Sequence, residues 1–158
     1  MTNVKWPKKI LLAIVFFFIA LQFIQPARNN NGQVLPTDFT NTYAVPAGVR
    51  TLLRNACYDC HSNNTRYPWY VNTEPLAWIM TGHIKDGKEK LNFSEFGGYP
   101  ARRRISKLKG IANSIKDDRM PLSSYKLMHK TGSLSQADKT LIIDWMQKTV
   151  DSLQGFRN

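Results

Sequence analysis

Cysteine and histidine are scarce in this chain of 158 residues. It contains two cysteines and three histidines. A disulfide framework that stabilises a small secreted fold normally uses more cysteines, so no such framework is expected. The length is that of one domain, and it is sufficient to bury a hydrophobic core without cross-links.

Strand signals are also lacking. No stretch sustains the alternation of apolar and polar residues that predicts a half-buried strand, and the sequence holds no internal repeat or low-complexity tract. Apolar residues recur instead at helical spacing in residues 46–56, 73–91, 100–116 and 135–153, and a further short helix is expected over residues 124–130. We therefore predict an all-α fold.

The long uncharged apolar run lies at the N-terminus. Lys5, Lys8 and Lys9 precede a stretch from Ile10 to Ile24, a pattern shared by signal peptides and membrane anchors. The run is shorter than the roughly 20 residues of a usual spanning helix, and no small-residue cleavage site follows it. We predict that residues 1–25 form an uncleaved N-terminal membrane-anchor helix, with a cleaved signal segment as the alternative.

Charge around this run predicts the orientation of the chain. Three lysines precede the run and Arg28 alone follows closely, so the positive-inside rule leaves the N-terminus in the cytoplasm. Residues 26–45, rich in Asn, Thr and Pro, are expected to be a linker, and residues 46–158 the functional domain. The domain is then expected on the periplasmic side of the inner membrane, or exported if the N-terminal segment is cleaved.

Both cysteines lie in one short motif, Cys57-Tyr58-Asp59-Cys60-His61. Two thiols three residues apart can add to the two vinyl groups of one haem, and the following histidine is placed to bind the iron. Random placement would produce this C-x-x-C-H arrangement roughly once in four thousand cases. A thioredoxin-like pair expects a βαβ context, zinc needs two further ligands at paired spacing, and a structural disulfide is the third alternative. The motif predicts one covalently attached haem c per chain, held by Cys57, Cys60 and His61.

The second axial position on the iron has two candidates. Met120 lies in a loop that Pro121 stiffens, and a Met/His ligand pair suits electron transfer. His83 lies on the expected inward face of the helix over residues 73–91 and is the alternative distal ligand. Each also has an ordinary interpretation, Met120 as a side chain that fills a core gap and His83 as a hydrogen-bonded core histidine.

Other side chains are candidates for the walls and edge of the haem pocket. Four aromatic residues are expected either to wall the porphyrin or to pack in an ordinary core: Tyr67, Trp69, Tyr70 and Trp78. Arg66 or Arg119 is expected either to pair with a haem propionate or to remain solvated.

The last expected helix contains IIDW, and three distinctive stretches precede it: CYDCHSNNTRYPWY, HIKDGKEKLNFSEF and RMPLSSYKLMH. Together they resemble the small bacterial haem-binding domain family with a single C-x-x-C-H motif. The resemblance covers roughly residues 45–150. It implies a cytochrome c-like helical domain around one covalently bound haem, often exported or membrane-anchored. The chain is more loosely similar to class I cytochromes c, whose distal Met-Pro loop falls here on Met120, although Ile-Lys-Asp-Asp-Arg replaces their glycine-rich lead into that loop.

The expected function is electron transfer by a monohaem c-type cytochrome-like protein outside the cytoplasm. The alternative is a haem-based sensor or accessory module with a displaceable sixth ligand. An enzyme is not expected, because a peroxidase would need a distal His and Arg pair and His83 has no such companion. The formal charge is +11, and the basic face from Arg102 to Lys109 is either a solvated surface or a docking patch for an acidic redox partner or anionic lipid. No nucleic-acid recognition motif is present.

Overall fold

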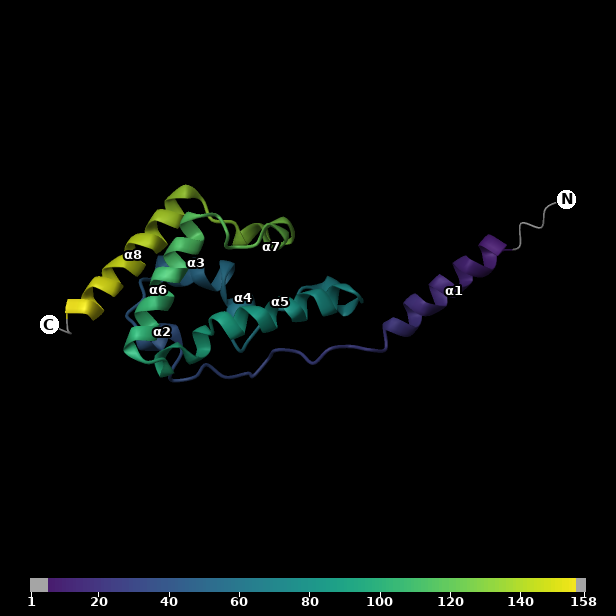
Figure 1. Cartoon of the computed structure of the whole chain (residues 1–158), viewed down its shortest axis with the longest axis horizontal. Coiled ribbons are helices and arrows are strands. Elements are labelled where there is room, and N and C mark those ends of the chain that lie inside the picture. Colours follow the sequence, from purple (N-terminus) through teal and green to yellow (C-terminus); the bar gives the residue numbers. More distant parts are fainter. Residues whose placement is uncertain (1–5, 156–158) are drawn as a thin grey trace.

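We describe residues 6–155 of the chain from a computed structural model (Figure 1). The α-helices are α1 (Trp6–Leu21), α2 (Phe39–Thr42), α3 (Ala47–Ala56), α4 (Tyr58–His61), α5 (Leu76–Lys90), α6 (Ala101–Lys116), α7 (Ser123–Met128) and α8 (Gln136–Gly155). Three 3₁₀ turns lie between them, η1 (Trp69–Asn72), η2 (Phe93–Gly98) and η3 (Lys130–Gly132). Within residues 6–155 the sole β-type pairing is an isolated bridge between Asn30 and Asn64, so the prediction of an all-α fold is confirmed.

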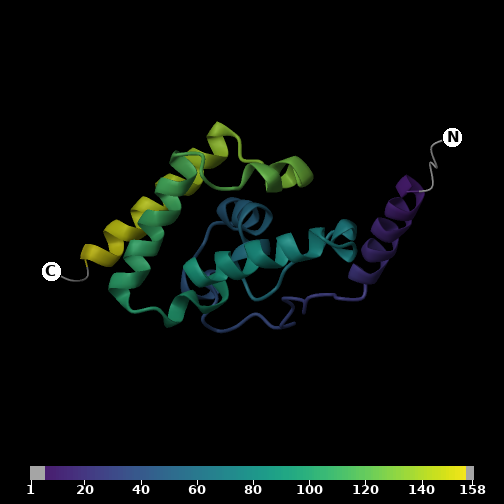
Figure 2. The same ribbon diagram turned by 45° about the vertical axis from the view of Figure 1, so that its right-hand side comes forward.

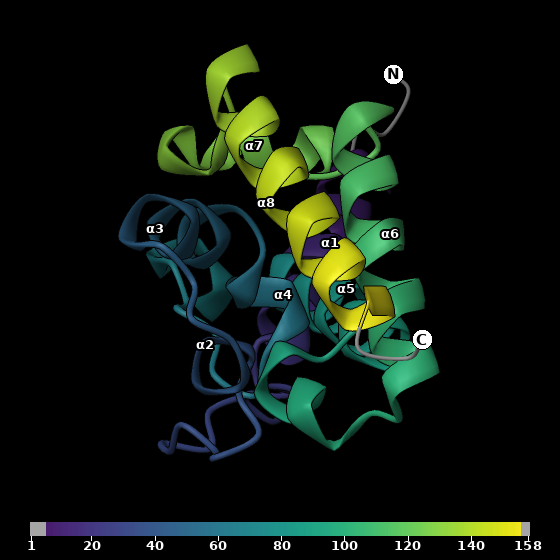
Figure 3. The same ribbon diagram turned by 90° about the vertical axis from the view of Figure 1, so that its left-hand side faces the viewer.

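Helices α6 and α8 form an antiparallel pair that makes one wall of the domain (Figure 3). The buried stripe of α6 is the one that its sequence predicts: Ile105, Leu108, Ile111, Ala112 and Ile115. It packs against Ile142, Met146 and Val150 of α8. Helix α8 is preceded by a capping-box arrangement, because the Ser135 and Asp138 backbone N–H groups each donate to the other residue's side chain, at 2.9 and 3.2 Å.

The cysteine motif occupies a helical turn of its own. Helix α3 begins after Pro46 and buries Val49, Leu53 and Ala56. Cys57 then leaves helical geometry, with φ −130° and ψ −42°, and so ends α3 and begins α4. Because α4 contains only Tyr58–His61, the whole motif is presented by one turn that packs between α3 and α5.

Helix α5 packs on that turn through a glycine. A Cβ on Gly87 would lie 2.6 Å from the carbonyl oxygen of Cys60, so only glycine permits this approach of the two backbones. The contact sets the rotation of α5. Ala77, Ile84 and Gly87 are buried. His83, which was expected on the inward face, is exposed, as are Leu76 and Ile79.

The segment expected to be a linker, residues 26–45, is an integral part of the domain. Phe39 of α2 is fully buried, and its ring packs edge-on against Phe93, Phe96 and Trp145. The Asn29 side chain donates to the Ser62 carbonyl oxygen at 2.8 Å. The turn-forming residues of this segment indicated a linker, whereas Phe39 and Val45 within it are buried in the core.

Helix α1 extends away from the rest of the chain, as the two views in Figures 1 and 2 agree. It has 16 residues, none of which is buried. Across residues 6–155, none of the helices combines the length and the apolar character needed to cross a membrane. The expected membrane-anchor helix is therefore not seen as a spanning helix in this structure.

Candidate functional site

A two-lobed cavity lies between the cysteine motif, α5, α6 and the loop that follows α6. The first lobe has a volume of about 240 Å³ and the second about 270 Å³. Ala56, His61, Lys90 and Met120 line both lobes, so the two lobes adjoin along these residues. Taken together they reach the size of ordinary cofactor pockets, roughly 300–1,000 Å³. The walls of the first lobe are largely apolar, with Leu91, Phe93, Ile111 and Ile115 among them.

The three motif side chains share this cavity. Cys57 lines the first lobe, Cys60 lines the second, and His61 lines both. Neither thiol is in a disulfide. Burial raises the pKa of Cys57 to about 12 and the pKa of Cys60 to about 11, with the neighbouring Asp59 carboxylate adding to both shifts. Thiols with raised pKa values hold little thiolate at neutral pH, which is unlike the lowered pKa of a thioredoxin-type redox pair.

The ring of His61 is fixed by two backbone carbonyl groups. Its Nδ1 atom lies 2.9 Å from the Gly87 oxygen and 3.1 Å from the Leu91 oxygen. Carbonyl oxygens only accept hydrogen bonds, so Nδ1 carries the proton. Burial lowers the pKa of His61, which keeps the ring neutral and leaves the lone pair on Nε2. A neutral imidazole whose Nδ1–H donates to a backbone carbonyl is oriented for metal ligation through Nε2.

Met120 reaches the cavity because of the way α6 ends. Asp118 adopts a left-handed conformation, with φ +54°, and the backbone N–H groups of Arg119 and Met120 donate back to the Ser114 carbonyl at 3.0 and 3.1 Å. Lys139 of α8 forms an ion pair with Asp118. The left-handed conformation of Asp118 is one that glycine adopts readily. The Met120 side chain lines both lobes, as His61 does.

His83 lies at the same cavity but lines the second lobe alone. It is exposed, and it precedes Gly87 by one helical turn on α5. The structure therefore brings all five sequence-derived candidates, Cys57, Cys60, His61, Met120 and His83, to one cavity, with Met120 in the more central position of the two distal candidates.

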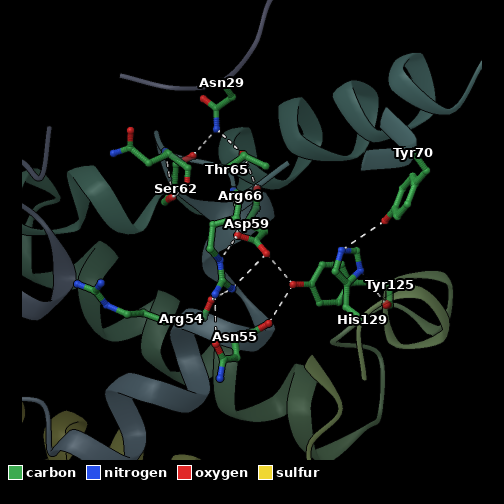
Figure 4. A network of polar contacts seen from close by, with 11 residues as sticks. Asn29, Arg54, Asn55, Asp59, Ser62, Thr65, Arg66, Tyr70, Tyr125 and His129 are labelled. Carbon is green, nitrogen blue, oxygen red and sulfur yellow. Dashed lines mark hydrogen bonds and ion pairs between the residues drawn. The ribbon is translucent and has the colours of Figure 1, made fainter. Parts of the chain in front are cut away.

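The aromatic residues expected to wall the pocket lie elsewhere. Tyr67 does not line this cavity. Its hydroxyl oxygen instead accepts a hydrogen bond from the Asn29 backbone N–H at 2.7 Å. Trp69 and Trp78 are exposed, and the Tyr70 hydroxyl points to His129, at 3.3 Å (Figure 4). The aromatic side chains that line the cavity are Phe93 and Tyr125.

Neither arginine proposed for a propionate lines the cavity. Arg66 pairs with Asp59 at 3.0 Å and Arg119 pairs with Asp117 at 3.1 Å. The cationic side chains that line the cavity are Lys90 and Lys107. The sequence did not place these two lysines or the two aromatic residues at the haem pocket, although Lys107 belongs to the basic face identified above. Each comes from a segment distant from the motif, and no local pattern marks its position at the cavity.

Asp59, the second variable residue of the motif, ties α4 to its surroundings (Figure 4). Its buried carboxylate accepts hydrogen bonds from the Arg66 backbone N–H and side-chain Nε, at 3.2 and 3.0 Å. The Tyr125 hydroxyl of α7 lies 2.8 Å from the Asp59 carboxylate and 2.9 Å from the Asn55 carbonyl oxygen. Hydrogen bonds to this buried carboxylate tie the motif both to Arg66, which follows it in the chain, and to Tyr125 of α7.

An apolar pocket with a neutral imidazole, a thioether and two thiols on its walls fits haem, because the ring nitrogen and the sulfur are both iron ligands. The model of the haem-binding domain family matches residues 16–148, a span that includes every residue of this cavity. No curated protein and no solved structure matches the chain. The chain belongs to the haem-binding domain family, and haem is its cofactor.

Proposed function

We propose that the protein is a monohaem c-type cytochrome-like electron carrier that acts outside the cytoplasm. The observation that carries this proposal is the position of His61 and Met120, which line both lobes of one apolar cavity with Cys57 and Cys60 beside them. This set offers two axial ligands and two attachment points for a single haem.

Covalent attachment is proposed at the two motif cysteines. Each S–H would add across one vinyl C=C bond of the haem, which forms a thioether and consumes no oxidant. Free thiols are needed for that addition, and both cysteines are unpaired. A chain that meets haem outside the cytoplasm must keep these thiols from forming a disulfide until the addition occurs.

The axial ligands are proposed to be His61 through Nε2 and Met120 through its sulfur. A Met/His pair raises the reduction potential and leaves no open position on the iron, and both properties suit an electron carrier. The dry, apolar wall of the first lobe would tune the potential in the same direction.

A haem-based sensor or accessory module is the second candidate. His83 and Met120 both line the second lobe, so an imidazole would be available to compete for the distal position. In that case the sixth ligand would be displaceable, and the reduced protein would bind an external diatomic gas.

The location and the partner are part of the same proposal. The N-terminal segment with α1 would attach the protein to the periplasmic side of the inner membrane, or direct its export if it is cleaved. A redox partner with an acidic surface would dock on basic side chains, among which Lys90 and Lys107 already lie at the cavity. Such docking predicts electron-transfer rates that fall as ionic strength rises.

Carbon monoxide binding separates the two candidate functions. The full-length, haem-loaded protein is reduced and exposed to carbon monoxide, and its absorption spectrum is recorded before and after. An electron carrier is expected to show no change in the haem bands and to pass repeatedly between the oxidised and reduced forms. Prompt formation of a carbon monoxide complex in the native protein would refute the carrier and support the sensor.

A further inference from the structure

Large apolar side chains are exposed at the end of the domain from which α1 extends. We call this group the apolar end, and its members are Trp69 of η1, Leu76, Trp78 and Ile79 of α5, and Leu127 and Met128 of α7. Trp69 and Leu127 each expose 81% of their surface. In Figures 1 and 2, α7 and the beginning of α5 both lie on the side of the domain that faces α1. Exposed apolar groups that gather in one region mark a contact with a partner or a membrane.

A contact between side chains joins the two parts of the apolar end, η1 with the start of α5 on one side and α7 on the other. The Tyr70 hydroxyl lies 3.3 Å from Nε2 of His129, the residue that follows α7. The Trp69 ring packs edge-on against Tyr70, with 6.0 Å between the ring centroids. Trp69 and the exposed residues of α7 therefore belong to one continuous region of surface.

The same region is attached to the end of α1. The Glu74 backbone N–H donates to the Gln22 side-chain oxygen at 3.0 Å, and the Trp78 indole N–H donates to the Ile24 carbonyl oxygen at 3.0 Å. Helix α1 is exposed on all sides and strongly apolar. Any apolar layer that accepts α1 must therefore lie next to the apolar end.

The charge beside the apolar end favours an anionic surface. Lys126 and Lys130 flank Leu127 and Met128, and residues 122–132 contain no acidic side chain. Lysines near a membrane are attracted to anionic headgroups, and tryptophan prefers the boundary between headgroups and acyl chains. A water-soluble protein partner would explain the exposed leucine and methionine, but it would not explain why the same apolar end includes Trp78, which contacts the chain just after α1.

We propose that the apolar end is a membrane-contact surface that places Trp69, Leu127 and Met128 in the headgroup layer of a bilayer containing anionic lipid. The proposal rests on the proposed membrane attachment through the N-terminal segment and is independent of the haem ligands. Two points of contact, α1 and the apolar end, fix the orientation of the domain. The second lobe of the cavity, lined by His83 of α5 and Tyr125 of α7, lies between the two helices that carry this surface.

Photolabelling from the lipid phase tests the proposal. The full-length, haem-loaded protein is incorporated into vesicles of phosphatidylcholine and phosphatidylglycerol that contain a lipid with a photoactivatable diazirine. Labelled peptides are then identified by mass spectrometry. We expect labels in residues 69–79 and 123–130 as well as in α1. Leu141 of α8, which is 47% exposed and lies outside the apolar end, is expected to stay unlabelled.

Each other outcome overturns a defined part of the account. Labels confined to α1 would refute the membrane-contact surface and leave the membrane attachment standing. An absence of labels from α1 as well would refute both. The absorption spectrum of the same sample reports the haem ligands separately, so neither result depends on the electron-carrier proposal.

Variants identify the side chains that make the contact. The triple variant W69S/L127S/M128S changes exposed positions only and is expected to lower labelling of residues 123–130 several-fold, with L141S as the matched control. The variant K126E/K130E is expected to lower it to the level seen with vesicles of phosphatidylcholine alone. Unchanged labelling in the triple variant, or equal labelling with and without phosphatidylglycerol, would contradict the proposal.

Discussion

The carbonyl oxygen of Gly87 lies 2.9 Å from Nδ1 of His61. This one contact joins the helix that covers the motif to the proposed proximal ligand, and it fixes both the tautomer and the direction of the ring. It depends on a close approach of backbones that only a glycine permits at this position, because a Cβ there would lie 2.6 Å from the Cys60 oxygen. The first prediction concerns this glycine.

Gly87→Ala is expected to destabilise the protein by about 1–3 kcal/mol, as overpacking of a fixed backbone does. It is also expected to lower the yield of haem-loaded protein, because α5 must move away from the ring it orients. Thermal unfolding and the haem content of purified protein are the measurements. Gly82→Ala, on the same helix with no atom within 4 Å of the added Cβ, is the control and should be neutral or stabilising by up to about 1 kcal/mol. Equal behaviour of the two variants would contradict the role given to Gly87.

Met120→Ala is expected to open the sixth position on the iron. Loss of the thioether should lower the reduction potential and allow the reduced protein to bind carbon monoxide. Redox titration and the carbon monoxide difference spectrum check both effects. Met128→Ala, which removes an exposed methionine of α7, should change neither. An unaltered potential in Met120→Ala would exclude Met120 as the ligand.

His83→Ala tests the other candidate for the distal ligand. His83 is exposed and lines one lobe only, so its removal should leave the haem spectrum and the potential as they are in the unaltered protein. If the spectrum of His83→Ala instead became five-coordinate, the imidazole would be the distal ligand and the sensor would become the preferred function.

Tyr125→Phe removes the hydroxyl group that links α7 to the motif through Asp59 and Asn55. One hydrogen bond to a buried carboxylate is lost, and the free energy of unfolding should fall by about 1–3 kcal/mol. Because α7 follows the Met120 loop directly, we also expect a larger fraction of protein without the methionine ligand. Denaturant unfolding measures the first effect and absorption spectroscopy the second. A variant as stable as the original protein would show that the contact contributes nothing.

The two thiols should react slowly in the folded, haem-free chain. Burial raises the pKa of Cys57 to about 12 and that of Cys60 to about 11, and the thiolate is the reactive form. The rate of alkylation by iodoacetamide should therefore keep rising with pH beyond about 10, where a free cysteine with a pKa of about 8.5 is almost fully ionised and its rate levels off. Mass spectrometry of alkylated protein provides the rates, and the chain in denaturant is the reference. A folded chain whose rate levels off at the same pH as that of the chain in denaturant would contradict the raised pKa values.

Local sequence patterns were sufficient for helices α3, α5, α6, α7 and α8 and for recognising the motif. The spacing of Ile105, Leu108, Ile111 and Ile115 predicts both α6 and its buried face, and the pair Ser135 and Asp138 predicts the start of α8. Met120 and His83 were likewise identified as candidates from their residue type and position. In each case the signal lies within one segment, where the geometry of the helix or loop determines which side chains share a face.

Features that depend on contacts between distant segments could not be predicted in this way. The rotation of α5 depends on the approach of Gly87 to Cys60, which no periodicity records. The role of Phe39 depends on its contacts with Phe93, Phe96 and Trp145, and the turn-rich residues around it indicated a linker instead. Phe93 of η2 and Lys107 of α6 line the cavity although both elements are distant from the motif in the sequence, so only the tertiary structure shows them.

The most direct test of the central claim is the absorption spectrum of the oxidised full-length protein, produced with haem-attachment machinery. The account predicts a c-type haem spectrum with the weak long-wavelength sulfur-to-iron band, and haem that stays on the chain after denaturation in the original protein but not in C57A/C60A. A haem spectrum without that band would contradict the His61 and Met120 ligand pair. Haem that denaturation releases from the original protein would contradict covalent attachment at Cys57 and Cys60.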